Sequence, residues 1–401
     1  MDRKAHYRVL FCPSMRSGIR SGRLTGPIGP AGHMRRQIGR FDREFQPVPP
    51  RAPRPGVTCS DAAGWSERRR VVYMRAHAAK EPPGPWFHPC TLAPQPENSV
   101  IRLDGLMRTE PAAALPTTYE LVIGERVVNY CLYGPEDGIP VVSHSGSPGT
   151  RWKRPNVVSA IERSGVRMLV HDRPGYGGST RRAGRRVADA ADDVRRLADA
   201  LGWERFAVHG HSGGGPYALA CAALLPDRVT RCAVGAGTAP SHADGVDFFG
   251  RLDPSRGKTF RLALEGEQKL RPFMTEAAAS IMAKIAAGGP EMLPEPGEPA
   301  PPEPARAIDD PAAMARLRAT FADSLDGWVD DQFAAIHPWG FDVAGIATPV
   351  GIWHGSHDTR MPRAHSDWLT ANIPTAERFD YEGWHVPGDD VFGEILTWLR
   401  D

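Results

Sequence analysis

The chain has 401 residues, of which 24% are charged and 41% hydrophobic, and its formal net charge is +2. No apolar run approaches the roughly 20 residues of a membrane span, and the N-terminus lacks the basic and then apolar pattern of a signal peptide. None of the six cysteines has C-x-x-C spacing, so zinc and redox sites are disfavoured. We expect Cys131, Cys221 and Cys232 to be reduced core residues in a cytoplasmic protein.

Residues 1–110 differ in composition from the rest of the chain. Residues 1–100 hold 17 Lys/Arg against 7 Asp/Glu, a net charge of +10, which leaves −8 for the remainder. The segment is rich in Arg, Pro and Gly without a sustained period, which predicts a disordered extension. Three other interpretations are open. The segment could be a basic arm for nucleic acid or acidic membranes, an organellar transit peptide, or residues upstream of a true translation start at Met74 or Met107. The acidic remainder disfavours nucleic acid as its partner.

Strands and helices alternate from Thr118 onward. Two short strands around Gly124–Glu125 predict a hairpin, and apolar residues at i, i+3, i+4 and i+7 predict a helix from Val187 to Leu201. Charged side chains on its other face, including Asp193, are expected to face solvent. Strands are predicted at 118–123, 127–133, 141–144, 166–171, 206–211, 229–234, 349–354 and 376–379, and further helices after Ser212, near 364–371 and at 391–399.

This alternation predicts an α/β fold with a mostly parallel central sheet covered by helices on both faces. We assign the core of this fold to residues 111–238 and 346–401. In such sheets, functional sites form at the carboxyl ends of the strands, where each candidate below is placed.

The segment Gly210-His211-Ser212-Gly213-Gly214 lies between an apolar run, 206–208, and an alanine-rich run, 217–225. A serine on a sharp strand-to-helix turn exposes its Oγ, and glycines two positions away avoid a collision of Cβ atoms. The N-terminus of the next helix favours negative charge at that spot. The motif alone also fits a glycine-rich turn with an ordinary serine, but the strand and helix around it favour a nucleophile.

A serine nucleophile needs an imidazole base, which in turn needs a carboxylate. Asp358 follows a predicted strand, and His385 stands 27 residues later, before the final helix. Asp358 could instead be an ordinary turn residue, and Glu382 is a weaker candidate acid. Three other histidines are alternative candidates for the base. We expect His357 to lie beside Asp358, His365 to lie on a helix surface and His211 to point away from the serine.

The elbow and the chain order Ser212, Asp358, His385 resemble the α/β-hydrolase family, over roughly residues 117–401 without the insertion. Residues 144–149 resemble the family's His-Gly-x-Pro-Gly loop, with Ser145 in the usual His position. The resemblance implies an oxyanion hole made by the backbone N–H groups of Ser147 and Gly213, because Pro148 has no N–H. An ordinary Gly/Pro-rich connection is the alternative. Residues 172–179 resemble the family's next loop, in which Arg173 and Tyr176 are expected as supports beside the site.

Residues 239–345 take the place of one connecting helix, and the resemblance implies a helical cap inserted late in the sheet. Most aromatic residues of this cap are expected to form its own core. Trp339 and Phe341, near the return to the sheet, are predicted to line the substrate pocket. The Pro/Glu-rich run 290–304 predicts an exposed linker, with a proline-recognition role as the alternative.

The resemblance implies a serine hydrolase that cleaves an ester, thioester or amide of a largely apolar small molecule through an acyl-enzyme on Ser212. No metal or organic cofactor is implied, and we expect a monomer or a homodimer. Carbon–carbon bond hydrolases, cofactor-free perhydrolases and proline iminopeptidase-like peptidases share the constellation. Epoxide hydrolases and haloalkane dehalogenases use Asp at the elbow and are disfavoured. Hypotheses of another class are a catalytically silent small-molecule receptor and a nucleic-acid-binding protein that uses the basic extension.

Overall fold

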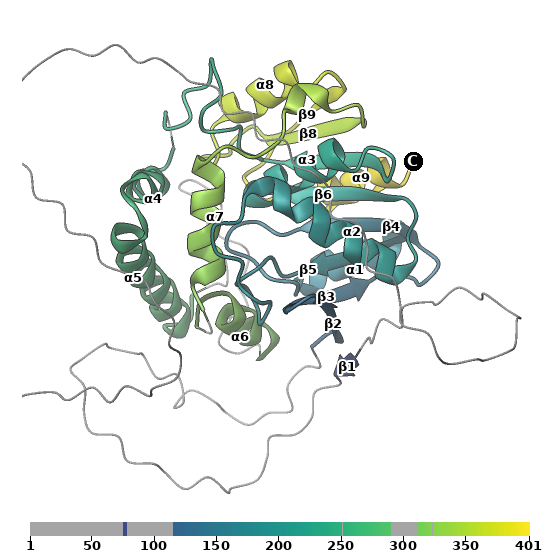
Figure 1. The fold of residues 1–401 in the computed structure, drawn as a ribbon, viewed down its shortest axis with the longest axis horizontal. Helices are drawn as coiled ribbons and strands as arrows, with labels where there is room; N and C mark the ends of the chain where they lie inside the picture. The colour runs from purple at the N-terminus through teal and green to yellow at the C-terminus, as the bar shows by residue number, and fades with distance from the viewer. Residues whose placement is uncertain (1–74, 78–114, 251, 290–310, 323) are drawn as a thin grey trace, which may run out of the picture. The chain divides into compact units, whose positions relative to one another are not determined.

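The computed structural model describes residues 75–77, 115–250, 252–289, 311–322 and 324–401 (Figure 1). The predicted disordered extension, apart from residues 75–77, and the predicted linker 290–304 lie outside the described residues. Arg75–His77 forms strand β1, which the sequence analysis did not predict, and pairs antiparallel with β2.

The described strands form one sheet in the order β1-β2-β3-β5-β4-β6-β7-β8-β9. The pairs β1–β2, β2–β3 and β3–β5 are antiparallel. The pairs β5–β4, β4–β6, β6–β7, β7–β8 and β8–β9 are parallel. The predicted hairpin and the predicted mostly parallel sheet are therefore confirmed. The strands are β2 (Thr118–Ile123), β3 (Arg126–Tyr133), β4 (Ile139–His144), β5 (Val166–His171), β6 (Phe206–His211), β7 (Val229–Gly235), β8 (Val350–Gly355) and β9 (Ala376–Tyr381).

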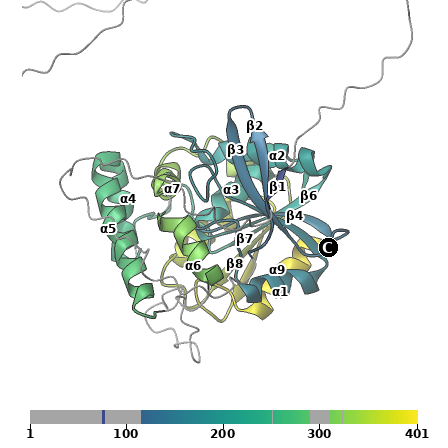
Figure 2. The same cartoon turned by 90° about the horizontal axis from the view of Figure 1, so that it is seen from below.

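Helices cover both faces of the sheet because successive strand residues point to opposite sides. Val141 and Met168 pack toward α1 (Pro155–Ser164) and α9 (Asp389–Arg400), which lie side by side in Figure 2. The residues next to them in the chain pack toward the other face. That face is covered by α2 (Ala190–Leu201), which continues a 3-10 turn at Val187–Asp189, by α3 (Gly215–Leu224) and by α8 (Arg363–Asn372).

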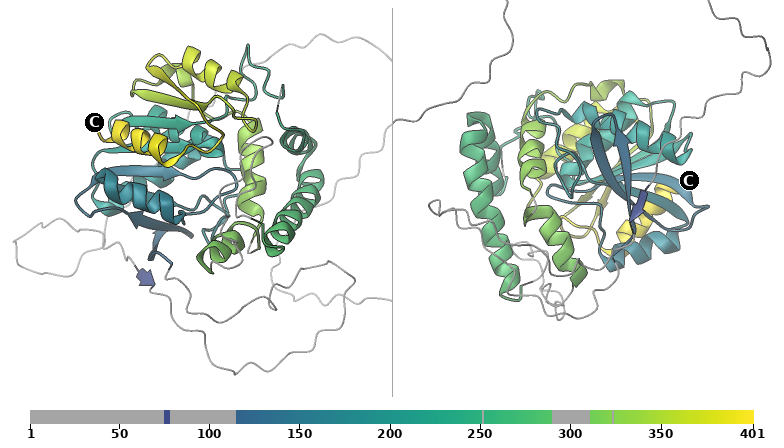
Figure 3. Two further views of the ribbon diagram at one scale, coloured as in Figure 1. Left: turned by 180° about the vertical axis from the view of Figure 1, so that it is seen from behind. Right: turned by 60° about the horizontal axis from the view of Figure 1, so that its bottom comes forward.

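Four α-helices lie between β7 and β8 in the described chain, within the segment 239–345 for which the sequence analysis predicted a helical insertion. They are α4 (Pro254–Glu265), α5 (Glu267–Ala286), α6 (Pro311–Leu317) with a π-helical turn at Arg318–Ala322, and α7 (Asp326–Ile336). Helices α4, α5 and α7 share an apolar cluster of their own. Figures 1 and 3 show α7 between the α4–α5 pair and the sheet.

Two polar residues that we expected on the surface are buried. Asp193 is 2% exposed because its carboxylate pairs with Arg126 of β3. His365 is 0% exposed, and its Nδ1 accepts a hydrogen bond from the backbone N–H of Ala239 at 3.2 Å. Both predictions were wrong, because amphipathic spacing cannot identify a polar group whose partner is distant in sequence.

The cysteines of the described chain, Cys131, Cys221 and Cys232, are buried and unbridged, as expected. None of the helices in the described ranges combines the length and the hydropathy that a membrane span requires.

Candidate active site

Ser212 occupies the turn between β6 and α3. Its φ angle of +53° lies in the left-handed region, where a non-glycine residue costs on the order of 1–3 kcal/mol. The residue is 4% exposed, whereas the sequence predicted an exposed hydroxyl. The loop of residues 144–149, for which the sequence predicts an oxyanion donor and which we call the oxyanion loop, lies over it: a Cβ added to Gly146 would be 3.6 Å from the Ser212 Cβ.

The glycines around the serine permit close approach of backbone segments. A Cβ added to Gly210 would lie 2.5 Å from the carbonyl oxygen of Gly214, and one added to Gly214 would collide with the carbonyl oxygen of His144. The turn therefore closes against the oxyanion loop only because these positions lack side chains.

Asp358 and His385 face each other. The Nδ1 atom of His385 lies 2.9 Å from Oδ2 of Asp358. The other carboxylate oxygen of Asp358 accepts backbone N–H groups from Arg360 at 2.9 Å and Met361 at 2.8 Å. Burial raises the pKa of Asp358, and the N–H of Met361 opposes this effect. Asp358 is thus both a turn residue and the partner of the histidine, two roles that the sequence presented as alternatives.

Backbone hydrogen bonds join the two loops that carry this pair. The N–H of Ser356 donates to the Tyr381 carbonyl at 2.9 Å, and the N–H of His357 donates to the Gly383 carbonyl at 2.8 Å. The His385 ring lies 4.9 Å, centroid to centroid, from the ring of His211, the residue before the serine. The three predicted catalytic residues are therefore brought to one region, at the carboxyl ends of β6, β8 and β9.

The alternative acid and bases are placed elsewhere or lack a suitable partner. His357 and Glu382 are exposed. His365 is held by the Ala239 backbone, and burial lowers its pKa to about 4. His211 is half-buried beside His385, and desolvation together with the His385 charge lowers its pKa well below the usual value.

The two predicted oxyanion donors lie next to each other. A Cβ added to Gly213 would lie 2.6 Å from the Ser147 Cβ and 3.2 Å from the Ser147 nitrogen. Ser145, which stands where the family usually has His, donates through Oγ to the Thr150 carbonyl at 2.9 Å. The same Oγ accepts from Nζ of Lys153 at 3.0 Å. Burial lowers the pKa of Lys153 to about 8, and no sequence motif had singled this lysine out.

Arg173 and Tyr176 contact the oxyanion loop. The guanidinium of Arg173 donates to the carbonyls of Ser145 and Gly146, and the Tyr176 hydroxyl lies 3.4 Å from Oγ of Ser147. Both residues therefore support the loop, as the sequence suggested. Their common partner on α7, Asp331, was not predicted.

Trp339 and Phe341 lie in the main apolar core. Trp339 is 1% exposed and belongs to the cluster that includes Val187 and Tyr217, and Phe341 packs against the same cluster. Their rings are 5.7 Å apart. Core packing accounts for both rings, so contact with a substrate stays a prediction without support from their positions.

Among the described residues, no group of three or more His, Cys, Asp or Glu side chains is arranged to hold a metal ion.

Comparison with known proteins places these residues in a family context. The family model of the alpha/beta hydrolase fold matches residues 139–385. The chain is 40% identical over 102 residues to a non-heme chloroperoxidase from Streptomyces lividans, a match that covers 25% of this chain and 37% of the relative. It is 38% identical over 133 residues to a putative carbamate hydrolase, RutD, from a Caulobacter species, which covers 32% and 44%. The chain therefore spans less than half the length of these curated relatives.

Solved structures share the fold. A hydrolase from Pseudomonas aeruginosa superimposes with a TM-score of 0.50 at 22% identity, covering 70% of this chain and 97% of that one. An esterase from a Rhodococcus species gives a TM-score of 0.50 at 17% identity with the same coverage, 70% and 97%. At these identities the likeness concerns the fold alone.

Proposed function

The chain belongs to the alpha/beta hydrolase fold family, and from that premise we propose that it is a serine hydrolase of small, largely apolar esters, thioesters or amides. Ser212 is the nucleophile, His385 the general base and Asp358 the residue that orients it. The backbone N–H groups of Ser147 and Gly213 form the oxyanion hole. The α4–α7 segment is the cap that covers the site.

The observation that carries this proposal is the 2.9 Å contact between Nδ1 of His385 and the buried carboxylate of Asp358. A carboxylate at Nδ1 keeps the proton on that nitrogen and leaves the lone pair on Nε2, the form required of a general base. The left-handed backbone of Ser212 supports the same conclusion, because such strain persists where a function requires it.

In the proposed mechanism, Oγ of Ser212 attacks the substrate carbonyl while Nε2 of His385 takes the hydroxyl proton. The two N–H groups stabilise the oxyanion that forms. His385 then gives its proton to the leaving alcohol, thiol or amine, and an acyl-enzyme remains. Water attacks this ester with His385 again as base, and the carboxylic acid and Ser212 are released.

The test is hydrolysis of p-nitrophenyl esters of increasing acyl length by the full chain and by Ser212→Ala. We expect kcat to fall by at least about three orders of magnitude in the variant. Ser164→Ala, at the end of α1, is the matched control and should retain full activity. A Ser212→Ala protein that hydrolyses esters as well as the wild type would exclude the serine mechanism. If the folded wild type binds esters or amides but does not hydrolyse them, the result would favour a catalytically silent small-molecule receptor.

Perhydrolysis is a second candidate, favoured by the 40% identity over 102 residues to a protein named non-heme chloroperoxidase. Hydrogen peroxide would replace water as the nucleophile toward the acyl-enzyme, giving a peracid and Ser212. Halogenation of monochlorodimedone in the presence of a carboxylic acid, peroxide and bromide measures this activity. It should disappear in Ser212→Ala. A p-nitrophenyl carbamate in the ester series examines the activity named for the other relative.

A further inference from the structure

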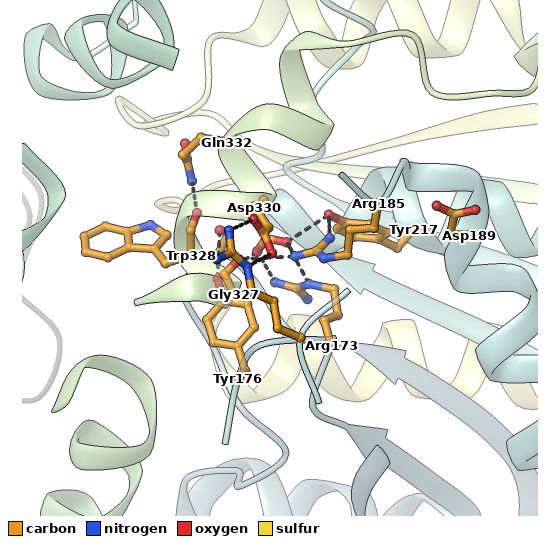
Figure 4. Close-up of polar contacts among 12 residues, drawn as sticks. Arg173, Tyr176, Arg185, Asp189, Tyr217, Gly327, Trp328, Asp330 and Gln332 are labelled. Atoms are coloured by element: carbon orange, nitrogen blue, oxygen red, sulfur yellow. Dashed lines mark hydrogen bonds and ion pairs between the residues drawn. The ribbon is translucent and has the colours of Figure 1, made fainter. Parts of the chain in front are cut away.

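A buried carboxylate on the cap helix α7 joins the cap to the core. Asp331 accepts hydrogen bonds from Arg173 at 2.6 and 3.2 Å, from Tyr176 at 2.8 Å and from Tyr217 at 2.8 Å, and it also pairs with Arg185. Figure 4 shows the side chains of Arg173, Tyr176, Arg185 and Tyr217 converging beside α7. The side chains of Asp331 and both arginines are at most 3% exposed, so little water screens this cluster.

Arg173 has a second set of partners in the oxyanion loop. Besides binding Asp331, its guanidinium donates to the carbonyl of Ser145, and its Nη2 donates to the carbonyl of Gly146 at 3.0 Å. One planar group therefore contacts the cap carboxylate and two consecutive loop carbonyls. Only a guanidinium offers enough donors in a fixed fork for this arrangement.

The second of these carbonyls controls the direction of the oxyanion donor. The C=O of Gly146 and the N–H of Ser147 belong to the same peptide unit, and in a planar trans peptide they point in opposite directions. A guanidinium that holds the C=O on one side therefore aims the N–H toward the other side. Gly213 approaches the Ser147 nitrogen, which places the two proposed donors together.

We propose that Arg173 and Asp331 are positioning residues that hold the Ser147 N–H in the oxyanion hole, so that cap helix α7 sets the catalytic geometry of the core. This inference rests on the proposed function. Tyr176 adds a second link, since its hydroxyl donates to Asp331 and lies 3.4 Å from Oγ of Ser147. The positive charge of Arg173 also polarises the Gly146–Ser147 peptide, which strengthens its N–H as a donor.

A simpler role for the cluster is to dock α7 on the core. The docking is close: the N–H of Gly327 donates to the Gly175 carbonyl at 3.1 Å, and a side chain at Gly327 would collide with the Tyr176 ring. The neighbouring residue on α7, Asp330, forms a separate two-bond pair with Arg181 at 2.7 and 2.9 Å. No described contact joins Arg181 to the oxyanion loop, so this pair docks the cap and serves as the matched control.

The variants must keep the buried cluster folded. Truncation to alanine would remove the hydrogen-bonding atoms together with the charge and leave the partners buried without compensation. Arg173→Lys keeps the charge but cannot reach the carboxylate and both carbonyls in one plane. Asp331→Asn removes the negative charge but keeps the shape of the side chain and one acceptor for the surrounding donors. Arg181→Lys is the control for the first substitution and Asp330→Asn for the second.

The experiment measures kcat and KM of the full chain on its best p-nitrophenyl ester, together with inhibition by a trifluoromethyl ketone of matching acyl length. The ketone forms a tetrahedral adduct whose oxyanion needs the same donors. We expect Arg173→Lys and Asp331→Asn to lower kcat by about 10- to 100-fold with KM changed less than about threefold. The inhibition constant should rise by the same factor as kcat/KM falls. Both control variants should remain within about twofold of wild type.

A second readout does not depend on activity. The Ser147 amide resonance, observed by NMR in the selectively 15N-labelled chain, should shift in Arg173→Lys and Asp331→Asn and stay in place in both controls. If the controls lose as much kcat as the test variants, the cluster only docks the cap and the inference is overturned. A wild type without hydrolase activity would refute the proposed function instead. The Ser147 resonance then decides the positioning role, and an unchanged resonance in both test variants overturns it.

Discussion

Buried neutral histidines should make the stability of this protein fall steeply in mild acid. His209 lies within β6, with Nδ1 3.0 Å from Oγ of Ser143 and its ring edge-on to Phe392 at 5.8 Å. Burial lowers the pKa of His209 to about 3, and burial lowers the pKa values of His171 and His365 to about 4.

The direction of the effect follows from proton binding. At pH values below the ordinary histidine pKa of 6.5, these histidines are protonated in the unfolded chain but stay neutral in the folded chain. The free energy of unfolding therefore decreases as the pH falls from 6.5 toward the lowered folded pKa values. At about pH 5 each of the three histidines should lower the free energy of unfolding by about 2 kcal/mol, which gives about 6 kcal/mol for the three together. A domain has roughly 5–15 kcal/mol of stability in total, so a loss of this size is readily measured.

Urea unfolding followed by circular dichroism at about pH 7 and about pH 5 measures this loss. In His209→Gln, the stability difference between the two pH values should be smaller than in wild type by about 2 kcal/mol. His242→Gln, which replaces an exposed ring, should keep the wild-type difference. Burial raises the pKa of Asp172 and of Asp358, which acts in the opposite direction but is common to all three proteins. An unchanged difference in His209→Gln would refute the burial argument.

Three further outcomes are expected. Asp358→Asn should lower kcat on esters by roughly 10³- to 10⁴-fold with little change in KM, because the amide no longer holds the reactive tautomer of the base; a loss below about tenfold would argue against this triad. Gly214→Ala should lower the free energy of unfolding by about 2–4 kcal/mol in urea titrations, whereas Gly393→Ala, where an added Cβ meets nothing within 4 Å, should be neutral or stabilising. Asp193→Ala should lower the free energy of unfolding by about 3 kcal/mol, because it leaves the partly buried Arg126 without its carboxylate. A melting temperature equal to that of the wild type would contradict this prediction.

The sequence placed most of the core elements within a residue or two. The predicted strand at 166–171 and the predicted hairpin at 118–133 match the structure closely. The residues proposed for catalysis could be selected for a related reason. A serine between two glycines, an acid after one strand and a histidine after another are local patterns in chain order, and parallel strands bring their carboxyl ends to one edge.

The unpredicted features depend on contacts between distant residues. β1 has three residues and exists through its pairing with β2. Trp339 fills the core beside Val187 and Tyr217, which are distant from it in the chain. A short strand or a single residue carries no periodicity, so nothing in its own segment indicates these positions.

The sequence by itself determined most of the core strands and helices, β1 and α1 excepted, and where the candidate nucleophile, acid and base stand relative to the strand ends. Hydrophobic period and turn chemistry are properties of neighbouring residues, so they can be read along the chain. Only the tertiary structure decided which charges are buried and paired. Asp193 meets Arg126 across 67 residues, and Asp331 meets Arg173 across 158. An aspartate in a helix has the same local pattern whether it faces water or an arginine, and its environment is defined only when the distant partner packs against it.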